Sequence, residues 1–407
     1  MRANECFTLN KTGTTYQNRA ENCISQGALT NSKRPESLVK GIYPTHLKRG
    51  KGAYLWDEKG VKYLDYICGL GTALLGHSPE AVIAAILGGM GDGISLSLSS
   101  TLEVECAEMV KSFVPFIDKL KFFKNGSDAC TAAVRFARAH TGRKYVLSEG
   151  YHGSGDGFVS MTKPASGIMD DCYYSDLNKW DQDWGDVACV ILEPFNLDIG
   201  KDRIQWLMDL REKCTKEGVV LIFDEVITGM RVPGYTVSRY LGIEPDLICL
   251  GKAIASGMPL SVLGGPREIM DDPQVFYSQT AQGERLSLLA CMATLQEIKK
   301  KDVNNLWEQG AYFQERFNAI SDIIKLEGYP TRARFAGSDL DKALFFQESV
   351  RAGILFGPSF FYGFAQMEFD ILTLSTVSDI IRRIEVGSVK LGGELPQSPF
   401  SQKVRDK

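Results

Sequence analysis

The feature that most constrains the fold is an alternation between about residues 100 and 265, where short apolar runs are separated by segments of helical periodicity. The runs show no polar alternation, which is typical of strands in a parallel sheet that helices cover on both faces. Ligands of such sheets bind at the carboxyl ends of the strands, so the residues after each run are the first candidates for chemistry. Helices are expected at 128–140 and 202–217, and strands at 119–123, 143–148, 187–193, 219–225, 246–251 and 260–265.

The remaining sequence divides the chain into three expected parts. A length of 407 residues fits roughly two to three domains, or one large α/β unit with a satellite. Residues 1–70 form a polar arm followed by two apolar runs around a turn at 57–60, which predicts a hairpin. Residues 71–285 form the large ligand-binding domain. Residues 286–407 form a smaller C-terminal domain that begins with a long helical pattern.

Composition and charge exclude several classes of protein. Hydrophobic residues make up 44% and charged residues 24% of the chain, which is ordinary for a globular protein. The net charge of −4 and the lack of a basic tract argue against binding to nucleic acid or to an anionic membrane. No stretch approaches the roughly 18 apolar residues of a membrane span, and the N-terminus has no apolar signal region. We therefore expect a cytoplasmic protein.

The cysteines and histidines give no sign of a disulfide framework or a metal site. The ten cysteines are scattered, and none of them forms a Cys-x-x-Cys pair. We expect them to be small buried hydrophobic residues in a reducing compartment. The four histidines, at 46, 77, 140 and 152, do not pair at ligand spacing, so no metal is expected.

The strongest candidate for chemistry is the pair Asp224 and Lys252. Each follows an apolar run, so both are expected at the carboxyl edge of one sheet. A salt bridge on the surface is the simpler interpretation. The chemistry that requires this pair is that of pyridoxal 5'-phosphate (PLP): a partly buried lysine amine attaches the cofactor, and a carboxylate keeps its pyridine nitrogen protonated.

Two neighbouring segments could complete such a site. Gly126 and Ser127 follow the strand 119–123 and open a helix, whose N–H groups could bind phosphate; the alternative is a simple helix cap. Tyr151 follows the strand 143–148 at the same edge, where an aromatic ring could stack on a flat heterocycle. The alternative is a tyrosine of the core.

These motifs together resemble one enzyme family. The segment 221–265, LIFDEVITGMRVPGYTVSRYLGIEPDLICLGKAIASGMPLSVLGG, resembles the fingerprint of class III PLP-dependent aminotransferases. The phosphate loop at 125–143 and EGYHG at 149–153 follow the family order, and the similarity runs from about residue 40 to about 300. Within the family, the chain looks closest to the branch of glutamate-1-semialdehyde 2,1-aminomutase and related sugar aminotransferases.

The resemblance implies a fold and a set of residue roles. The fold is the α/β fold-type I of PLP-dependent transferases, with a mostly parallel central sheet, helices on both faces and a smaller α+β C-terminal domain. The active molecule is a homodimer with shared sites. Lys252 would be the Schiff-base lysine, and Asp224 would bind the pyridine nitrogen. The other cofactor contacts would be Gly126, Ser127, Tyr151, Glu193, Asn196, Val226 and Thr280, the last reaching the phosphate of the neighbouring subunit.

The sequence departs from the family at two places. Many relatives carry a C-terminal arginine that binds the α-carboxylate of glutamate, but residues 354–371 contain no arginine. Arg285 and the run 331–335 are the nearest replacements in sequence. The loop after Thr280 reads Ala-Gln-Gly-Glu-Arg, where aminomutases have Ser-Gly-Asn-Pro. Glu284 and Arg285 either meet the substrate or cap the following helix.

Three functions are therefore considered. The first is an aminotransferase that moves an amino group, from glutamate as the expected donor, to an aldehyde or ketone on a carbohydrate-like acceptor. The second is an aminomutase that acts on a semialdehyde. The third is a cofactor-binding protein without turnover, which has no chemical need for both Asp224 and Lys252. The expected partners are small molecules and a second copy of the chain.

Overall fold

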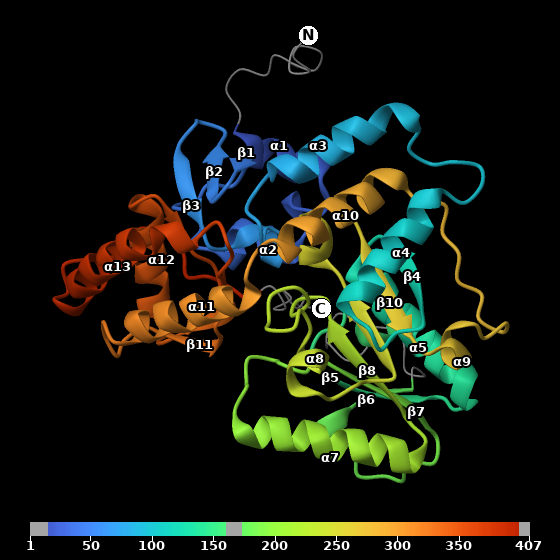
Figure 1. Cartoon of the computed structure of the whole chain (residues 1–407). Coiled ribbons are helices and arrows are strands. Elements are labelled where there is room, and N and C mark those ends of the chain that lie inside the picture. Colours follow the sequence, from blue (N-terminus) through green and yellow to red (C-terminus); the bar gives the residue numbers. More distant parts are fainter. Residues whose placement is uncertain (1–14, 160–172, 399–407) are drawn as a thin grey trace.

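The computed structural model describes residues 15–159 and 173–398. Its centre is a seven-stranded sheet with the order β4-β10-β9-β8-β7-β5-β6 (Figure 1). Strand β10 is antiparallel to both of its neighbours, and the pairs from β9 to β6 are parallel. The strands are β4 (Lys119–Phe123), β5 (Tyr145–Glu149), β6 (Tyr174–Asp176), β7 (Val187–Leu192), β8 (Val220–Glu225), β9 (Leu247–Leu250) and β10 (Ser261–Gly265).

Helices cover both faces of this sheet, as expected from the unbroken apolar runs. Helix α5 (Gly126–Thr141) packs on one face, where it meets the even-numbered residues Val220 and Ile222 of β8. Helix α7 (Lys201–Glu217) packs on the other face with Leu221 and Phe223. Successive side chains of a strand point to opposite faces, so a strand buried on both sides has no polar alternation. The expected mostly parallel α/β fold is confirmed.

A second sheet contains strands from the N-terminal and the C-terminal parts of the chain. Strands β1 (Leu47–Lys51), β2 (Tyr54–Asp57) and β3 (Lys62–Asp65) form an antiparallel meander, in which the hairpin expected around 57–60 is confirmed. Strand β13 (Ile354–Leu355) pairs in parallel with β3. The N-terminal segment therefore shares a sheet with the C-terminal part of the chain. The domain boundaries at residues 70 and 285 stay a prediction.

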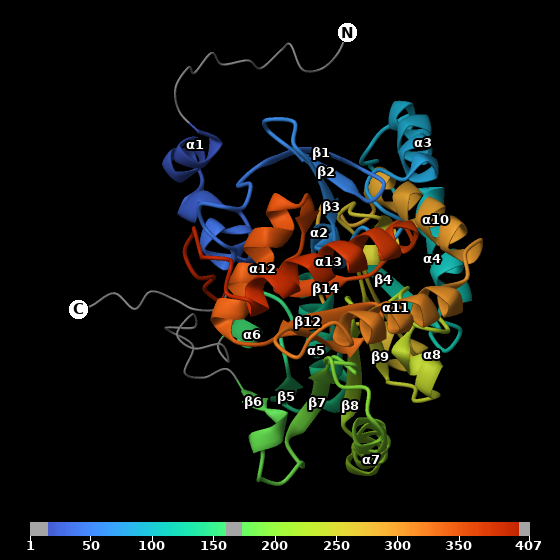
Figure 2. The ribbon, with the colours of Figure 1, turned by 90° about the vertical axis from the view of Figure 1, so that its left-hand side faces the viewer.

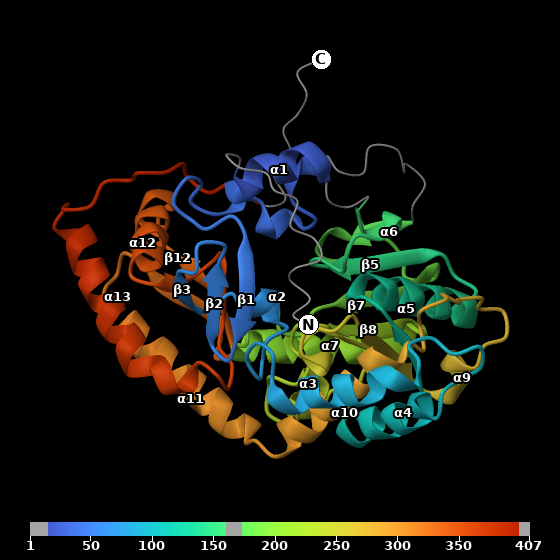
Figure 3. The same cartoon turned by 90° about the horizontal axis from the view of Figure 1, so that it is seen from above.

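The C-terminal part contains a third sheet with the order β11-β12-β14. Figure 2 shows α11, α12 and α13 grouped around β12 and β14, and in Figure 3 these helices lie away from the central sheet, beyond β1, β2 and β3. The elements are β11 (Lys325–Tyr329), β12 (Arg332–Ala336), β14 (Ser359–Phe361), α11 (Val303–Asn318), α12 (Asp339–Arg351) and α13 (Asp370–Glu385).

The remaining helices connect these sheets. Helix α10 (Arg285–Lys299) packs against α3 (Glu80–Gly89) and α4 (Thr101–Phe113). The shorter helices are α1 (Tyr16–Cys23), α2 (Cys68–Gly71), α6 (Asp156–Val159), α8 (Val237–Leu241), α9 (Arg267–Met270) and the 3₁₀ turn η6 (Lys252–Ala255). Within the described ranges we find no helix whose length and apolarity would let it cross a membrane.

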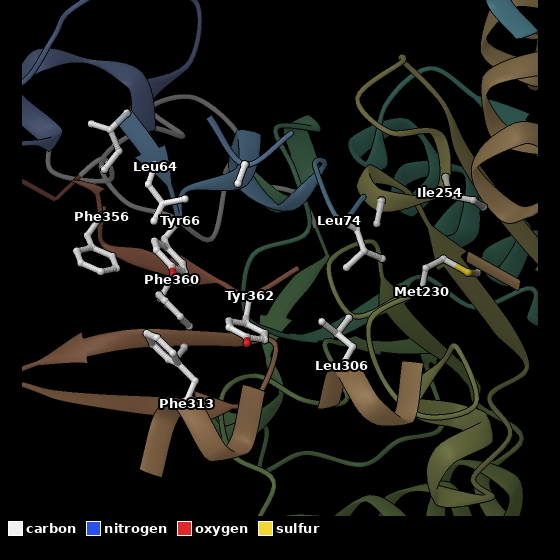
Figure 4. Close-up of a cluster of buried hydrophobic side chains, with 14 of the residues drawn as sticks. Leu64, Tyr66, Leu74, Met230, Ile254, Leu306, Phe313, Phe356, Phe360 and Tyr362 are labelled. Atoms are coloured by element: carbon white, nitrogen blue, oxygen red, sulfur yellow. The ribbon is translucent and has the colours of Figure 1, made fainter. Parts of the chain in front are cut away.

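Tyr66 lies at the centre of an aromatic cluster that joins the N-terminal and C-terminal segments (Figure 4). Its ring stacks on Phe356, Phe360 and Phe313 with centroid distances of 5.1, 5.2 and 6.0 Å. The hydroxyl shares a hydrogen bond of 2.8 Å with Thr373 Oγ1, and both side chains are fully buried. Tyr66 therefore contributes both apolar contact and a satisfied polar group at this junction.

We predict that Tyr66→Ala lowers the free energy of unfolding by about 3–5 kcal/mol, because it removes a buried ring and leaves a cavity. Tyr66→Phe should cost about 1 kcal/mol, because the Thr373 hydroxyl loses its partner. Urea denaturation measures both effects. Tyr312→Ala is the matched control, since that tyrosine is 51% exposed on α11 and should change stability little. Equal losses in Tyr66→Ala and Tyr312→Ala would contradict the assignment.

Candidate active site

The parallel pairing of β8 and β9 brings Asp224 and Lys252 to the same edge of the sheet. Asp224 lies opposite Cys249 in the register, and Lys252 follows two residues after the end of β9. Lys252 has a φ of 45°, a left-handed conformation that is unfavourable for a side chain with a Cβ. Such strain persists only where the surrounding structure enforces it, and it is concentrated at functional sites.

Asp224 is almost completely buried and is held by three donors. Its Oδ2 lies 2.8 Å from His152 Nδ1 and 3.4 Å from the Cys130 thiol, and its Oδ1 accepts the Val226 N–H at 3.1 Å. Burial alone raises the pKa of Asp224, but His152, the Val226 N–H and the charge of Lys252 together hold that pKa below its ordinary value. The side chain is therefore an anion that is fixed in one orientation.

Two of these donors were not identified from the sequence. His152 belongs to the segment 149–153, but only its neighbour Tyr151 was assigned a role. Its Nε2 lies 3.0 Å from the Glu149 carbonyl oxygen, which fixes the ring between β5 and β8. The available signal in the sequence was a histidine shortly after the expected strand 143–148. Cys130 gave no signal, because a cysteine on the inner face of α5 has the pattern of an ordinary core residue.

The pKa of the Lys252 ammonium lies below its ordinary value. Burial lowers the pKa of the Lys252 ammonium, while the carboxylates of Asp224 and Glu193 act in the opposite direction. The guanidinium groups of Arg332 and Arg231 lower this pKa further. A lysine with a lowered pKa can serve as a nucleophile and as a proton carrier near neutral pH.

The beginning of α5 lies against the same edge of the sheet. Asn125 caps the helix by accepting the Asp128 N–H at 2.9 Å, so neither Ser127 nor Asp128 is the cap. A Cβ on Gly126 would lie 2.8 Å from Val226 Cγ1, so only glycine allows this close approach. The Ser127 Oγ accepts the Ser154 N–H at 3.0 Å. The first helical turn and the Ser127 hydroxyl thus offer donors for an anion.

Two other expected contacts flank the pair. Val226 is buried directly after β8, and Tyr151, two residues after β5, is 50% exposed, so its side chain is accessible to a ligand. Thr280 is exposed in the loop before α10, and its neighbour Gln279 donates to Asp128 Oδ2 at 3.2 Å. The contact of Thr280 with a neighbouring subunit stays a prediction.

Glu193 and Asn196 lie in a turn after β7 that ion pairs hold in place. Arg203 binds the Glu149 carboxylate with two hydrogen bonds of 3.0 and 2.8 Å, and Asn196 Nδ2 donates to Glu149 Oε1 at 2.9 Å. Glu193 forms an ion pair of 2.8 Å with Arg332. Burial raises the pKa of Glu193 in spite of this cation.

Glu284 acts as a helix cap. Its carboxylate accepts the Ser287 hydroxyl at 2.6 Å and forms an ion pair of 3.0 Å with Lys124. Arg285 lies 3.5 Å from Asp92. The helix-capping alternative of the sequence is thus the one that the structure supports for Glu284.

The site contains groups that match the three parts of PLP that a protein must bind. The anionic Asp224 suits a protonated pyridine nitrogen, the neutral form of Lys252 suits a carbonyl carbon, and the open first turn of α5 suits a phosphate. Gly126 lets the start of α5 lie close against Val226, where a Cβ would clash. The residues present therefore fit the cofactor.

Comparisons with known proteins point to one enzyme family. The family described as Aminotransferase class-III matches residues 39–175 and 170–328. The chain is 30% identical over 381 residues to a glutamate-1-semialdehyde 2,1-aminomutase of Syntrophobacter fumaroxidans, covering 82% of this chain and 88% of the relative. It is 33% identical over 322 residues to the protein of the same name from Acetivibrio thermocellus, covering 72% and 74%.

Solved structures share the fold over nearly the whole chain. The FumI protein of Sphingopyxis sp. MTA144, in its PLP internal aldimine form, has a TM-score of 0.83 at 25% identity, covering 94% of this chain and 98% of the other. A glutamate-1-semialdehyde aminomutase from Pseudomonas aeruginosa PAO1 has a TM-score of 0.79 at 20% identity, covering 90% and 93%. The family match covers most of the sequence, and the chain therefore belongs to the class III aminotransferases, a family of PLP-dependent enzymes.

Proposed function

We propose that the protein is an aminotransferase in which Lys252 attaches the cofactor and carries the proton, and Asp224 binds the pyridine nitrogen. The observation that carries this proposal is the placement of a fixed anion and a desolvated amine at the ends of two adjacent parallel strands. When bound, PLP supplies an electron sink for the electron pair released at the substrate carbon.

Each residue of the site has its own role in the proposed reaction. Lys252 Nζ, in its deprotonated form, would carry a proton from the substrate carbon to the C4′ carbon of the bound cofactor. Asp224, oriented by His152, keeps the pyridine nitrogen protonated. Gly126 and Ser127 hold the phosphate, and Val226 and Tyr151 cover the two ring faces. Glu193 and Asn196 border the cofactor on the side of the turn after β7.

We propose glutamate as the amino donor and an aldehyde or ketone as the acceptor. The carbohydrate-like acceptor rests on the lack of arginine at 354–371. Two arginines from other elements, Arg231 and Arg332, are close enough to Lys252 to lower its pKa. A test is a set of half-reactions in which the pyridoxamine form is mixed with sugar aldehydes, semialdehydes and α-keto acids, and the return of the absorbance of the starting form is timed.

The second candidate is intramolecular amino transfer on a semialdehyde. The curated relatives named glutamate-1-semialdehyde 2,1-aminomutase favour it. Incubation with glutamate-1-semialdehyde, without any other donor, separates the two functions. An aminomutase returns only the isomer with the amino group at carbon 1, whereas an aminotransferase that uses the compound both as donor and as aldehyde acceptor gives a dioxo acid and a diamino acid in equal amounts.

We further propose that the active molecule is a homodimer. The segment from α3 to the start of α4 exposes a set of large apolar side chains, each at least 48% exposed in the single chain: Leu87, Met90, Ile94, Leu96, Leu98 and Val104. Surface patches of this kind are typical of interfaces. A second copy would cover them and would bring its Thr280 to the phosphate site.

We propose a cytoplasmic location from the state of the cysteines. All eight cysteines in the described residues are free, and seven of them are buried. Free buried thiols are typical of proteins in reducing compartments.

The attachment residue can be mapped directly. Borohydride treatment of the cofactor-loaded protein, followed by digestion and mass spectrometry, should find the cofactor on Lys252, because this amine is the one desolvated next to Asp224. Lys252→Ala should give no modified peptide. A label on another lysine would refute the assignment.

The role of Asp224 predicts a large loss of turnover. Asp224→Asn keeps the size of the side chain but removes the charge that holds the ring nitrogen protonated. We expect kcat to fall by about 10²-fold or more, as for other preorganised charged groups. Asp209→Asn, an exposed acid on α7, is the control and should leave kcat unchanged. Near-normal kcat in Asp224→Asn would mean that Asp224 is only a structural acid.

The proposed dimer can be tested at one exposed leucine. Leu98 is 85% exposed, and Leu98→Lys should shift the protein from dimer to monomer in sedimentation velocity, because a buried charge is costly at an interface. Ile371→Lys changes an equally exposed side chain on α13 and should leave the dimer intact. A monomeric wild-type protein would disprove the homodimer.

A further inference from the structure

Cys130 is a buried thiol that forms a hydrogen bond with the acid of the candidate site. It lies near the start of α5, where its side chain is 1% exposed. Its Sγ donates to Asp224 Oδ2 at 3.4 Å. Most buried cysteines serve as small hydrophobic residues, and the contact with a carboxylate sets this one apart.

The other buried positions of α5 show what packing against the sheet requires. Four of them are alanines, which let the helix lie close to the strands: Ala129, Ala132, Ala133 and Ala137. An alanine at position 130 would also suit this close packing, but it would leave Asp224 Oδ2 with one donor fewer. What the sulfur atom adds is therefore a polar contact with Asp224.

The donors are distributed unequally over the two oxygens of Asp224. His152 Nδ1, at 2.8 Å, and the Cys130 thiol both bind Oδ2. Oδ1 accepts the Val226 N–H at 3.1 Å. Each carboxylate oxygen has room for about two hydrogen bonds. Oδ2 is thus filled, and among the described residues Oδ1 keeps one acceptor position open.

The Cys130 thiol keeps its proton at neutral pH. Its pKa is raised well above the ordinary value by a hydrogen bond with Cys249, by burial and by the nearby charge of Asp224. Cys249 lies opposite Asp224 in the register of β8 and β9, so the two thiols and the carboxylate form one buried cluster. Cys130 is therefore a neutral donor to Asp224 and not a competing anion.

We propose that Cys130 is a positioning residue for the cofactor: together with His152 it occupies Oδ2 of Asp224, so that Oδ1 receives the N–H of the pyridine ring. Cys130 acts through Asp224 and does not itself touch the ring. The inference rests on the proposed role of Asp224 and adds a residue that sets its orientation and basicity. A thiol is a weak donor, so it stabilises the anion less than a hydroxyl would.

Loss of this donor has a consequence that can be measured without turnover. Without the thiol, the proton affinity of Asp224 rises, and the proton shared with the pyridine nitrogen lies closer to the carboxylate. The ring then carries less positive charge, and the nitrogen that joins Lys252 to the cofactor becomes more basic. Protonation of that nitrogen changes the visible absorbance of the holoenzyme, so a pH titration gives its midpoint.

Cys130→Ala should raise this midpoint by about 0.3 pH unit or more, as a fraction of one neutral hydrogen bond. The dissociation constant of PLP, measured by fluorescence titration of the apoprotein, should rise by about 3-fold or more. Cys130→Val, which nearly keeps the volume without the donor, should give the same shifts. Cys130→Ser should leave the midpoint at or below that of the wild type, because a hydroxyl is the stronger donor.

The matched control is Cys189→Ala. Cys189 is fully buried on β7 in the same apolar cluster as α5, and within the described ranges it forms no hydrogen bond with a carboxylate. This variant should lose a similar amount of packing, seen as a lower melting temperature, with an unchanged titration midpoint. An equal shift of the midpoint in Cys189→Ala and Cys130→Ala would mean that loosened packing is the cause, and the proposal would fail.

Asp224→Asn separates failure of this inference from failure of the proposed function. A shifted midpoint in Asp224→Asn, with an unchanged midpoint in Cys130→Ala and Cys130→Val, would make Cys130 a core residue only. An unchanged midpoint in Asp224→Asn as well would overturn the proposed role of Asp224 and that of Cys130 with it.

Discussion

The parallel pairing of β8 with β9 is the constraint on which the site depends. Two adjacent strands that run in the same direction end at the same edge, so an acid at the end of one and a lysine after the other are brought together by the backbone. The strands are buried on both faces, and their register is fixed by the packing of α5 and α7. A one-residue slip of β8 would turn Asp224 away from His152 and Cys130. The geometry of the candidate site is therefore a consequence of core packing.

Much of the fold could be predicted from the sequence, because the six apolar runs allow few arrangements of strands and helices. A run such as 187–193 can only be buried on both faces, and this requires helices above and below it. The antiparallel direction of β10 was not predicted, since an apolar run does not encode its direction. The edge strand β6 was missed because Tyr-Ser-Asp is short, polar and only partly buried. Its pairing with β5 is a tertiary contact without a local signature.

The site was predictable where a residue type follows a strand and unpredictable where distant segments meet. Asp224 and Lys252 each follow an apolar run, so their positions at the carboxyl edge of the sheet could be predicted. The burial of Arg231 could not be predicted, because its environment is formed by Gly71 and Phe361, which are far from it in sequence. Arg332 belongs to the run 331–335, which the sequence analysis gave as one of the nearest replacements for the missing C-terminal arginine. Its ion pair with Glu193, in the turn after β7, could not be predicted because the two residues are far apart in sequence.

The two neighbouring acids of β8 show that the surroundings of a buried carboxyl group decide the direction of its pKa shift. Asp224 and Glu225 are both buried, but successive residues point to opposite faces of the strand. Asp224 faces α5 and meets His152, so its pKa is lowered. Glu225 accepts the N–H groups of Val237 and Ser238 at 2.6 and 3.0 Å, yet burial outweighs these neutral donors and raises its pKa to about 7. Neutral hydrogen-bond donors thus fail to keep a buried carboxylate at its ordinary pKa, whereas a nearby imidazole and ammonium succeed.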